Sequence, residues 1–247
     1  MARHKPAAEG GYQRGEETRA KLIHAAVRVF GERGYEGAST REIASEAGVN
    51  APALQYYFDN KEGLYLACMA FILDRVKEQL RDVTAAADAA LAAPDTPDER
   101  LIEALLGILG GFVSFIQDTP HAADWRLFMA REQAGQGPPA AFRMLDEHFN
   151  QRIGGLSRQI IARLSGYAVD DERTVLHSFS IISQGMVFRV LRLQVLSTLG
   201  WEQIDHARMV KVRELLFSQT RSILRGLVAE RTARALGSGG SSPGRGI

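Results

Sequence analysis

Helical spacing of apolar residues is the feature that most restricts how this chain of 247 residues can fold. Apolar side chains recur at the spacing of a helix face through most of the sequence. The first such face is formed by Leu22, Ile23, Ala26, Val27 and Phe30. No window alternates apolar and polar residues as a half-buried strand does, and the Asn-Gly pair typical of tight hairpins is absent. The sequence therefore predicts an all-α protein with about nine helices.

The composition is that of an ordinary globular protein. Apolar residues make up 45% of the chain, charged residues make up 24%, and the formal net charge is +1, which together exclude wholesale disorder. Cys68 is the only cysteine, so no disulfide can form within one chain, and a reducing compartment is indicated. We interpret Cys68 as a small core residue rather than a redox sensor.

No segment has the pattern of an export signal or of a membrane span. Residues 1–15 contain Arg3, Lys5 and Arg14 without an apolar run behind them. The most apolar stretch, residues 104–116, is shorter than the roughly 18–20 residues that a membrane span needs. We therefore expect a cytoplasmic protein without a membrane partner.

Two short helices joined by a glycine turn are predicted between residues 39 and 58. Ser39 and Glu42 have the spacing of a capping box at the start of the first helix, which stops at Gly48. Asn50 is a good N-cap for the second helix, and Pro52 is tolerated in its first turn. The small core between the helices is expected to consist of Ile43, Ala44, Val49 and Leu54. This is the helix-turn-helix pattern, whose second helix enters the major groove of DNA. A longer helix is predicted to follow it, from about Lys61 to about Val83.

These residues resemble a known family. The segment from Thr40 to Leu64, with its Thr-Arg-Glu-Ile-Ala start, its Ala-Gly-Val-Asn turn and its Tyr-Tyr-Phe ending, is similar to the TetR family of bacterial transcription regulators. Four stretches resemble its CecR-like subgroup, namely residues 53–65, 128–133, 188–190 and 199–201. The resemblance implies an N-terminal three-helix DNA-binding domain and a larger C-terminal helical domain that binds a ligand and forms the dimer.

The resemblance also implies which residues contact DNA. Thr40 and Lys61 would bind phosphates, and Arg41 would pair with guanine. Gln55 would read adenine, but many members of the family have tyrosine there, so their operator sequence is not carried over. The implied contact set is Thr40, Arg41, Asn50, Ala51, Pro52, Ala53, Gln55, Tyr56, Tyr57 and Lys61.

Charge is the feature that fits DNA binding least well. Residues 1–60 contain eight basic and eight acidic side chains, whereas nucleic-acid-binding domains are usually basic. We therefore expect weak non-specific binding, and specific binding that depends on geometry and dimerisation. The basic side chains of residues 1–15 would reach a minor groove or remain in solvent, and both interpretations stay open.

The second half of the chain carries no motif of an enzyme or a metal site. Phosphate loops, nucleophile elbows, His-Glu-x-x-His and cysteine pairs are all missing, so we expect no enzymatic activity, no cofactor and no metal. His121 and Asp124 have helical spacing, which favours a hydrogen bond at a helix start over a metal site. Apolar walls with a few polar groups suggest a ligand pocket, although each aromatic residue taken alone fits a core position better. The candidate ligand contacts are Phe112, Phe115, Trp125, Arg126, Phe128, Met129, Phe149, His177, Gln184, Phe188 and Arg189.

The last two long helices, predicted at residues 170–199 and about 201–236, are expected to form a dimer surface. One apolar stripe consists of Leu176, Phe179, Ile182 and Met186, and the other of Leu215, Leu216, Ile223 and Leu227. Two such helices from each subunit would form a four-helix bundle. A two-fold dimer would place two recognition helices roughly 34–36 Å apart, which is one turn of DNA.

The sequence is therefore interpreted as four segments. They are a flexible arm (1–15), a helix-turn-helix DNA-binding domain (16–62), a ligand-binding and dimerisation domain (63–236) and a disordered tail (237–247). The leading hypothesis is a homodimeric repressor that binds a palindromic operator in double-stranded DNA and is released by a small-molecule effector. The alternative is a helical protein-interaction or small-molecule-processing protein whose DNA-reading head is not functional.

Overall fold

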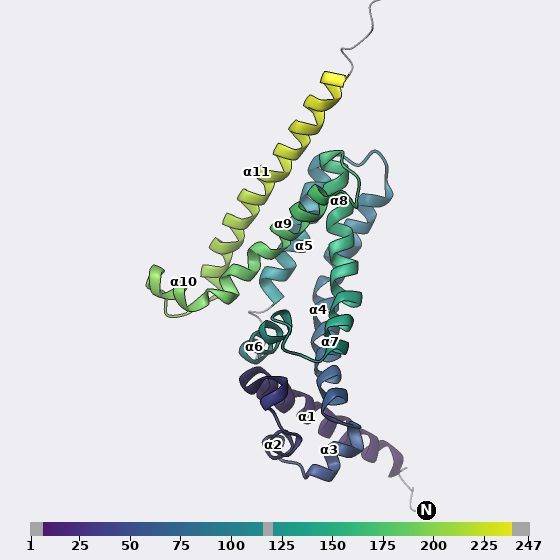
Figure 1. Cartoon of the computed structure of the whole chain (residues 1–247), viewed down its shortest axis with the longest axis vertical. Coiled ribbons are helices and arrows are strands. Elements are labelled where there is room, and N and C mark those ends of the chain that lie inside the picture. Colours follow the sequence, from purple (N-terminus) through teal and green to yellow (C-terminus); the bar gives the residue numbers. More distant parts are fainter. Residues whose placement is uncertain (1–6, 116–120, 239–247) are drawn as a thin grey trace, which may run out of the picture. The chain divides into compact units, whose positions relative to one another are not determined.

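The computed structural model describes residues 7–115 and 121–238, and every regular element in them is a helix (Figure 1). The prediction of an all-α fold is confirmed. These residues form eleven α-helices and one π-helical stretch, rather than about nine helices. The α-helices are α1 (Ala7–Gly37), α2 (Thr40–Glu46), α3 (Ala51–Tyr57), α4 (Lys61–Ala92), α5 (Asp98–Phe115), α6 (Ala122–Gln133), α7 (Pro139–Leu145), α8 (Gly155–Ser165), α9 (Glu172–Val190), α10 (Arg192–Leu199) and α11 (His206–Ser238), and the π-helical stretch η1 (Asp146–Gly154) joins α7 to α8.

Three boundaries differ from the prediction. Helix α1 begins at Ala7, so the described part of the expected arm is helical, and residues 1–6 lie outside the described residues. Helix α4 continues to Ala92, past the predicted end near Val83, because the last turns are rich in alanine, which favours the helix. The expected single helix from residue 170 to 199 is broken at Leu191, which separates α9 from α10. Of the expected tail, residues 239–247 lie outside the described residues.

The chain divides into two compact units. Unit 1 consists of Met1–Arg75 with Pro120–His148, and unit 2 of Val76–Thr119 with Phe149–Ile247. Helices α6 and α7 therefore belong to the same unit as the first three helices, although they follow α5 in the sequence. The predicted boundary between residues 62 and 63 separates a DNA-binding segment from a ligand-binding and dimerisation segment. It divides the chain by function and not by packing, and it stays a prediction.

Unit 1 is organised by the packing of α1 against α6, and α2 contacts both α1 and α3 (Figure 1). Its aromatic core joins Phe30 of α1, Tyr65 of α4 and Phe128 of α6, all three fully buried. The ring centroid of Tyr65 lies 4.9 Å from that of Phe30 and 4.6 Å from that of Phe128. Cys68 is buried beside this core, and burial raises the pKa of its thiol, as expected of a core residue.

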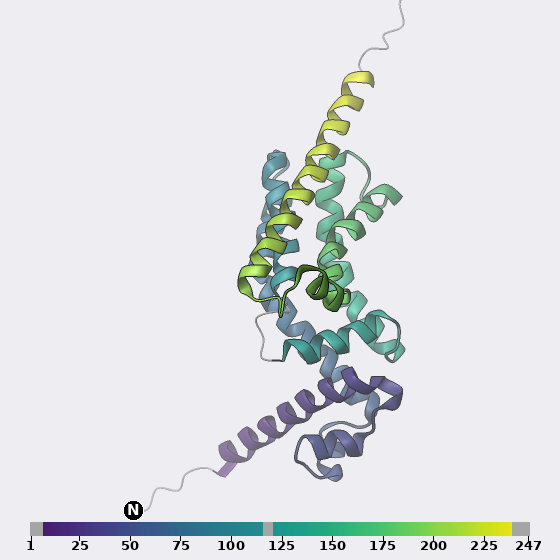
Figure 2. The ribbon, with the colours of Figure 1, turned by 90° about the vertical axis from the view of Figure 1, so that its left-hand side faces the viewer.

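Unit 2 is a bundle in which α5 packs against α8, α9 and α11, and Figure 2 shows α11 running alongside it. A buried cluster joins α5 to α11 through Leu109, Val113, Val212 and Leu216, with Phe188 and Phe217 against it. Glycines in α5 allow this close packing. A Cβ atom at Gly110 would stand 2.7 Å from the ring of Phe217, and one at Gly111 would stand 2.4 Å from Leu80.

Arginine side chains also hold unit 2 together. Three ion pairs connect α11 to α5, namely Arg221–Glu103, Arg225–Glu99 and Arg231–Asp98. Arg163 of α8 donates to the backbone carbonyls of Ala90, Leu91 and Ala93 at the end of α4. The last carbonyls of a helix have no partner within it, so this guanidinium caps α4.

No single helix among the described residues is both long enough and apolar enough to cross a bilayer. The bent pair Glu172–Phe188 and Arg192–Leu199, with 62° between its parts, meets the length and composition criteria only when the two parts are taken together.

Candidate nucleic-acid interface

The short helices α2 and α3 are fixed by the caps that the sequence predicts. The hydroxyl of Ser39 accepts a hydrogen bond from the backbone N–H of Glu42, and the side-chain oxygen of Asn50 accepts one from that of Ala53 (2.9 Å). Gly48 has a φ of 67°, which a glycine adopts without strain, and it turns the chain between the two helices. The helix-turn-helix geometry is thus encoded locally, by two caps and one glycine.

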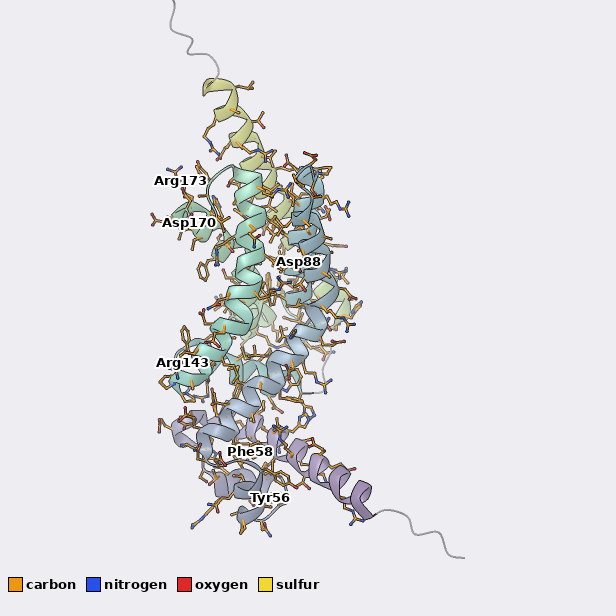
Figure 3. All side chains as sticks on the ribbon, turned by 90° about the vertical axis from the view of Figure 1, so that its right-hand side faces the viewer. Tyr56, Phe58, Asp88, Arg143, Asp170 and Arg173 are labelled. Atoms are coloured by element: carbon orange, nitrogen blue, oxygen red, sulfur yellow. The ribbon has the colours of Figure 1, made fainter. Side chains whose placement is uncertain are left out.

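The inner face of this pair is closed. Ile43, Ala44 and Leu54 are buried, and Val49 is half-buried. Tyr56 is 83% exposed, whereas Phe58 at the end of α3 is buried (Figure 3). The guanidinium of Arg19 in α1 lies 5.5 Å from the centre of the Phe58 ring, which ties α3 back to α1. The predicted small core is confirmed, and α3 has one buried and one open face.

The open face carries the predicted DNA contacts. Six of the side chains are exposed, namely Arg41, Asn50, Ala51, Pro52, Gln55 and Tyr56, and four are half-buried, namely Thr40, Ala53, Tyr57 and Lys61. The Tyr56 and Tyr57 rings stand edge to face, with centroids 5.1 Å apart. The structure therefore places all ten residues on α2, α3, the turn between them or the start of α4, with none fully buried.

Some of the basic side chains near this surface form ion pairs with other described residues of the protein, and others do not. Arg28 and Arg33 of α1 pair with Glu46 and Glu42 of α2. Arg41 is exposed and forms no ion pair with any residue that the structure describes. These two pairs engage two of the eight basic side chains of residues 1–60, and Arg41 remains as a positive group on the open face.

Lys61 has partners within the protein. Its ammonium lies 3.5 Å from the backbone carbonyl oxygen of Ala38 and 4.5 Å from the centre of the Tyr35 ring. It thereby connects the start of α4 to the end of α1. The sequence suggested a phosphate contact and gave no sign of this internal role, because both partners lie more than twenty positions away.

The predicted ligand contacts are divided between the two units. Trp125, Arg126, Phe128 and Met129 belong to unit 1, whereas Phe112, His177, Gln184 and Phe188 belong to unit 2. Phe128 is fully buried in the aromatic core, and Phe188 packs on the α5–α11 cluster, so both serve as core residues. Gln184 accepts a hydrogen bond from Thr220 of α11 (3.2 Å). The side chains of Phe115, Phe149 and Arg189 lie outside the described residues, and the pocket itself stays a prediction.

The sequence did not predict that two histidines, His24 and His121, lie close together. The rings of His24 in α1 and His121 before α6 lie 4.7 Å apart, and Nδ1 of His121 is 3.9 Å from a carboxylate oxygen of Asp124. Burial, and then the charge of His121, lowers the pKa of His24. Within the described ranges, no group of three or more potential metal ligands is found. Only the tertiary packing brings these rings together, because they are far apart in sequence.

The predicted dimer stripes are partly wrong. Leu176 and Phe179 on α9 are 59% and 66% exposed, and Leu215 and Ile223 on α11 are also exposed, while Ile182 and Met186 are half-buried. Leu216 and Leu227, however, are buried inside the subunit and cannot lie on an open surface. Adjacent helical residues are about 100° apart around the axis, so Leu215 and Leu216 face different sides. The sequence analysis also missed five exposed apolar residues beyond the stripe, namely Val187, Val190, Leu191, Leu193 and Leu199.

Comparisons with known proteins agree with this geometry. Residues 22–68 match the N-terminal model of the bacterial regulatory proteins of the tetR family, and residues 101–227 match the C-terminal domain of HTH-type transcriptional dual regulator CecR. The chain is 32% identical over 216 residues to HTH-type transcriptional dual regulator CecR of Shigella flexneri, covering 87% of this chain and 94% of that one.

Solved structures share the fold. A TetR-family transcriptional regulator from Bordetella parapertussis aligns with a TM-score of 0.60 and 15% identity, over 82% of this chain and 93% of that one. AibR, crystallised with isovaleryl coenzyme A and operator DNA, aligns with a TM-score of 0.59 and 16% identity, over 82% of this chain and 97% of that one. The CecR relative and the Bordetella parapertussis protein are transcriptional regulators.

Proposed function

The chain belongs to the TetR family of bacterial regulatory proteins and carries a C-terminal domain of the CecR type, and from this premise we propose that it is a homodimeric repressor that a small molecule releases from a palindromic operator. It is a DNA-binding transcription regulator and not an enzyme. The observation that carries the proposal is the two-sided α2–α3 pair, whose inner face is buried while its outer face presents Arg41, Gln55 and Tyr56.

On this outer face we assign different tasks to different residues. Arg41 pairs with guanine, and Gln55 reads adenine, because these pairings match the donors and acceptors in the major groove. Thr40, Tyr56 and Tyr57 contact sugar and phosphate, which fixes the register of the protein on the duplex. Asn50 uses its side-chain oxygen as the cap of α3, so its amide N–H is the group left for DNA. Ala51, Pro52 and Ala53 lie against base edges and thymine methyl groups.

Homodimerisation is supported by the apolar side chains that α9 and α11 leave in solvent. Leu176, Phe179, Leu215 and Ile223 are large, apolar and exposed, and a cluster of such side chains would mark an interaction site. A two-fold dimer presents two copies of α3 to DNA and therefore reads a palindrome. We keep the assignment of residues 16–62 to DNA binding and of 63–236 to ligand binding and dimerisation.

The ligand response is supported by the complex of AibR, which holds isovaleryl coenzyme A together with operator DNA. A coupling free energy of about 1–3 kcal/mol, or roughly 5–150-fold in operator affinity, suffices for such a response. Acyl-coenzyme A thioesters are therefore a first class of compounds to screen against this chain. A compound that saturates the protein and leaves operator affinity unchanged is not its effector.

The experiment that tests the proposal is selection from a random pool of duplex DNA by the full-length chain, followed by titration at several salt concentrations. We expect enrichment of a palindrome whose half-sites are one helical turn apart. Arg41→Ala should lower affinity for the enriched sequence, whereas Arg100→Ala, an exposed arginine on α5, should not. If no sequence is enriched and binding to all duplexes is equally weak, the alternative of a non-functional reading head is correct.

A further inference from the structure

One motif has no part in the function described so far. The segment Phe128-Met129-Ala130-Arg131-Glu132-Gln133 lies within the stretch that matches the CecR C-terminal domain, yet it forms α6, which packs against α1 in unit 1. Three of its side chains are directed at helices that adjoin the helix-turn-helix. This placement gives the motif a role in the DNA-binding unit, where the sequence match alone would not put it.

Arg131 caps α1 at the point where that helix is interrupted. Its Nε donates to the backbone carbonyl of Gly31 (2.6 Å) and its Nη2 to that of Glu32 (2.8 Å). The next helical turn contains Gly34, whose φ of 77° breaks the regular helix. Carbonyls before such a break lack helical partners, and a planar guanidinium satisfies two of them at once. The third nitrogen, Nη1, donates to the side chain of Gln136 (3.0 Å), which holds the guanidinium in place.

Glu132 holds the beginning of α4. Its carboxylate is only 1% exposed and accepts a hydrogen bond from the hydroxyl of Tyr65 (2.9 Å). The chain after α6 closes over this pair at Gly137, where a Cβ atom would stand 1.9 Å from the carboxylate and 2.9 Å from the Tyr65 hydroxyl. A buried carboxylate is costly unless it is hydrogen-bonded, so the pair fixes Tyr65 relative to α6.

Phe128 fills the space between these two polar attachments. Its ring contacts those of Tyr65 (4.6 Å between centroids) and Phe30 (6.5 Å). The helix-turn-helix joins the rest of the chain through the end of α1 and the start of α4, and α6 is attached to both. The position of α2 and α3 therefore depends on α6.

We propose that Arg131 and Glu132 are positioning residues for operator binding, which set the orientation of the helix-turn-helix by fixing the end of α1 and the start of α4. This inference rests on the proposed function. Neither residue is placed in contact with DNA. Their contribution is to make the DNA-reading helices rigid, so their loss reduces discrimination between sequences more than it reduces general attraction to DNA.

The test compares operator affinity with affinity for an unrelated duplex of equal length. In Arg131→Ala and Glu132→Leu we expect operator affinity to fall about tenfold, a size typical of residues that act without touching the ligand. Affinity for the unrelated duplex should change by less than about twofold, because phosphate attraction does not require precise orientation. Glu132→Gln should retain most operator affinity, since its amide oxygen can still accept from Tyr65. Arg143→Ala, an exposed arginine on α7, is the matched control (Figure 3).

Each outcome decides a different question. If both variants stay folded and bind the operator as tightly as the unaltered protein, the inference is wrong and the proposed function stands. If the two duplexes lose affinity equally, the residues serve stability only, and the inference is again wrong. If the unaltered protein selects no operator, both the proposed function and the inference fail. Should Arg131→Ala not fold, Tyr65→Phe allows the same comparison, because it removes one hydroxyl and keeps the ring.

Discussion

The seam between α1 and α6 in unit 1 differs sharply from the outer face of α9 and α10 in unit 2. In the seam, Phe30, Tyr65 and Phe128 are fully buried by residues of the same chain. On α9, Leu176 and Phe179 remain largely exposed, and no residue of α10 is fully buried. A short helix without a fully buried side chain has little to stabilise it in water. The difference teaches that the first region buries its large apolar side chains within the chain, whereas the second leaves them exposed.

Polar interactions do not distinguish the two units. Arg131 caps α1 in unit 1 as Arg163 caps α4 in unit 2, each through backbone carbonyls near a helix end. Both units therefore satisfy their exposed helix ends in the same way. What separates the two units is whether their large apolar side chains are buried or exposed. Variants of Phe128 and Phe179 test this difference directly, and variants of polar residues sharpen it.

The largest effect is expected from Phe128→Ala. Removal of a fully buried phenylalanine leaves a cavity in the aromatic core and should lower the free energy of unfolding by about 3–5 kcal/mol. Chemical denaturation at a fixed protein concentration measures this change. Phe142→Ala, at an exposed position of α7 in the same unit, is the control and should have little effect. Equal effects of the two variants would show that the core is not where the structure places it.

Next in size is Phe179→Asp on α9. A charge at an exposed apolar position should not disturb the subunit, but in a dimer it would be buried against the partner. We expect the dimer dissociation constant to rise about thirtyfold or more, corresponding to ~2 kcal/mol for a central interface residue. Sedimentation velocity over a range of concentrations measures it, with Val169→Asp before α9 as the control. A variant that remains dimeric at every concentration would remove α9 from the interface.

Arg41→Ala tests whether the exposed surface of unit 1 is used differently from that of unit 2. We expect a loss of about 1–3 kcal/mol in operator binding together with relaxed base preference, and no change in dimerisation. Fluorescence anisotropy on single-base operator variants measures both properties.

Lys61→Ala is the comparison for that experiment. It should weaken binding evenly across sequences, and it should also lower the unfolding midpoint, because Lys61 contacts Ala38 and Tyr35. If Arg41→Ala and Lys61→Ala change base preference alike, the distinction between a base-reading residue and a phosphate-binding residue is wrong.

The smallest effect concerns pH and the buried carboxylate of the seam. Burial raises the pKa of Glu132 above its ordinary value of 4.5, against the lowering effect of the Tyr65 hydrogen bond. The folded state thus holds this proton more tightly than the unfolded state. Its contribution to stability is greatest below pH 4.5 and is lost as the pH rises through the raised pKa. Glu132→Gln should therefore gain stability relative to the unaltered protein over that range, as measured by urea unfolding at several pH values.

Glu99 in unit 2 provides a control of opposite sign. Its hydrogen bond with Arg225 lowers its pKa, so the stability that it contributes is lost as the pH falls. Glu99→Gln should differ from the unaltered protein most at neutral pH and least in acid. Parallel curves for the two variants would contradict the burial of Glu132.

The helix-turn-helix was predictable because its determinants are local. Ser39, Gly48 and Asn50 act on residues within a few positions of themselves, so the caps and the turn follow from the sequence. The open face of α3 was predictable for the same reason, since helical spacing separates Leu54 from Tyr56. The dimer stripes were only half correct, because periodicity identifies an apolar face without identifying what covers it, as Leu216 and Leu227 demonstrate.

The sequence by itself determined the all-α fold, the DNA-reading pair and the family, because these depend on spacing, caps and a contiguous motif. Only the tertiary structure decided that α6 belongs with α1, that Arg131 and Glu132 hold the helices on either side of the DNA-reading pair, and that no residue of α10 is fully buried. The physical reason is separation along the chain. Arg131 donates a hydrogen bond to the backbone carbonyl of Gly31, which is 100 positions away in the sequence. No local sequence pattern predicts which distant carbonyl a guanidinium contacts.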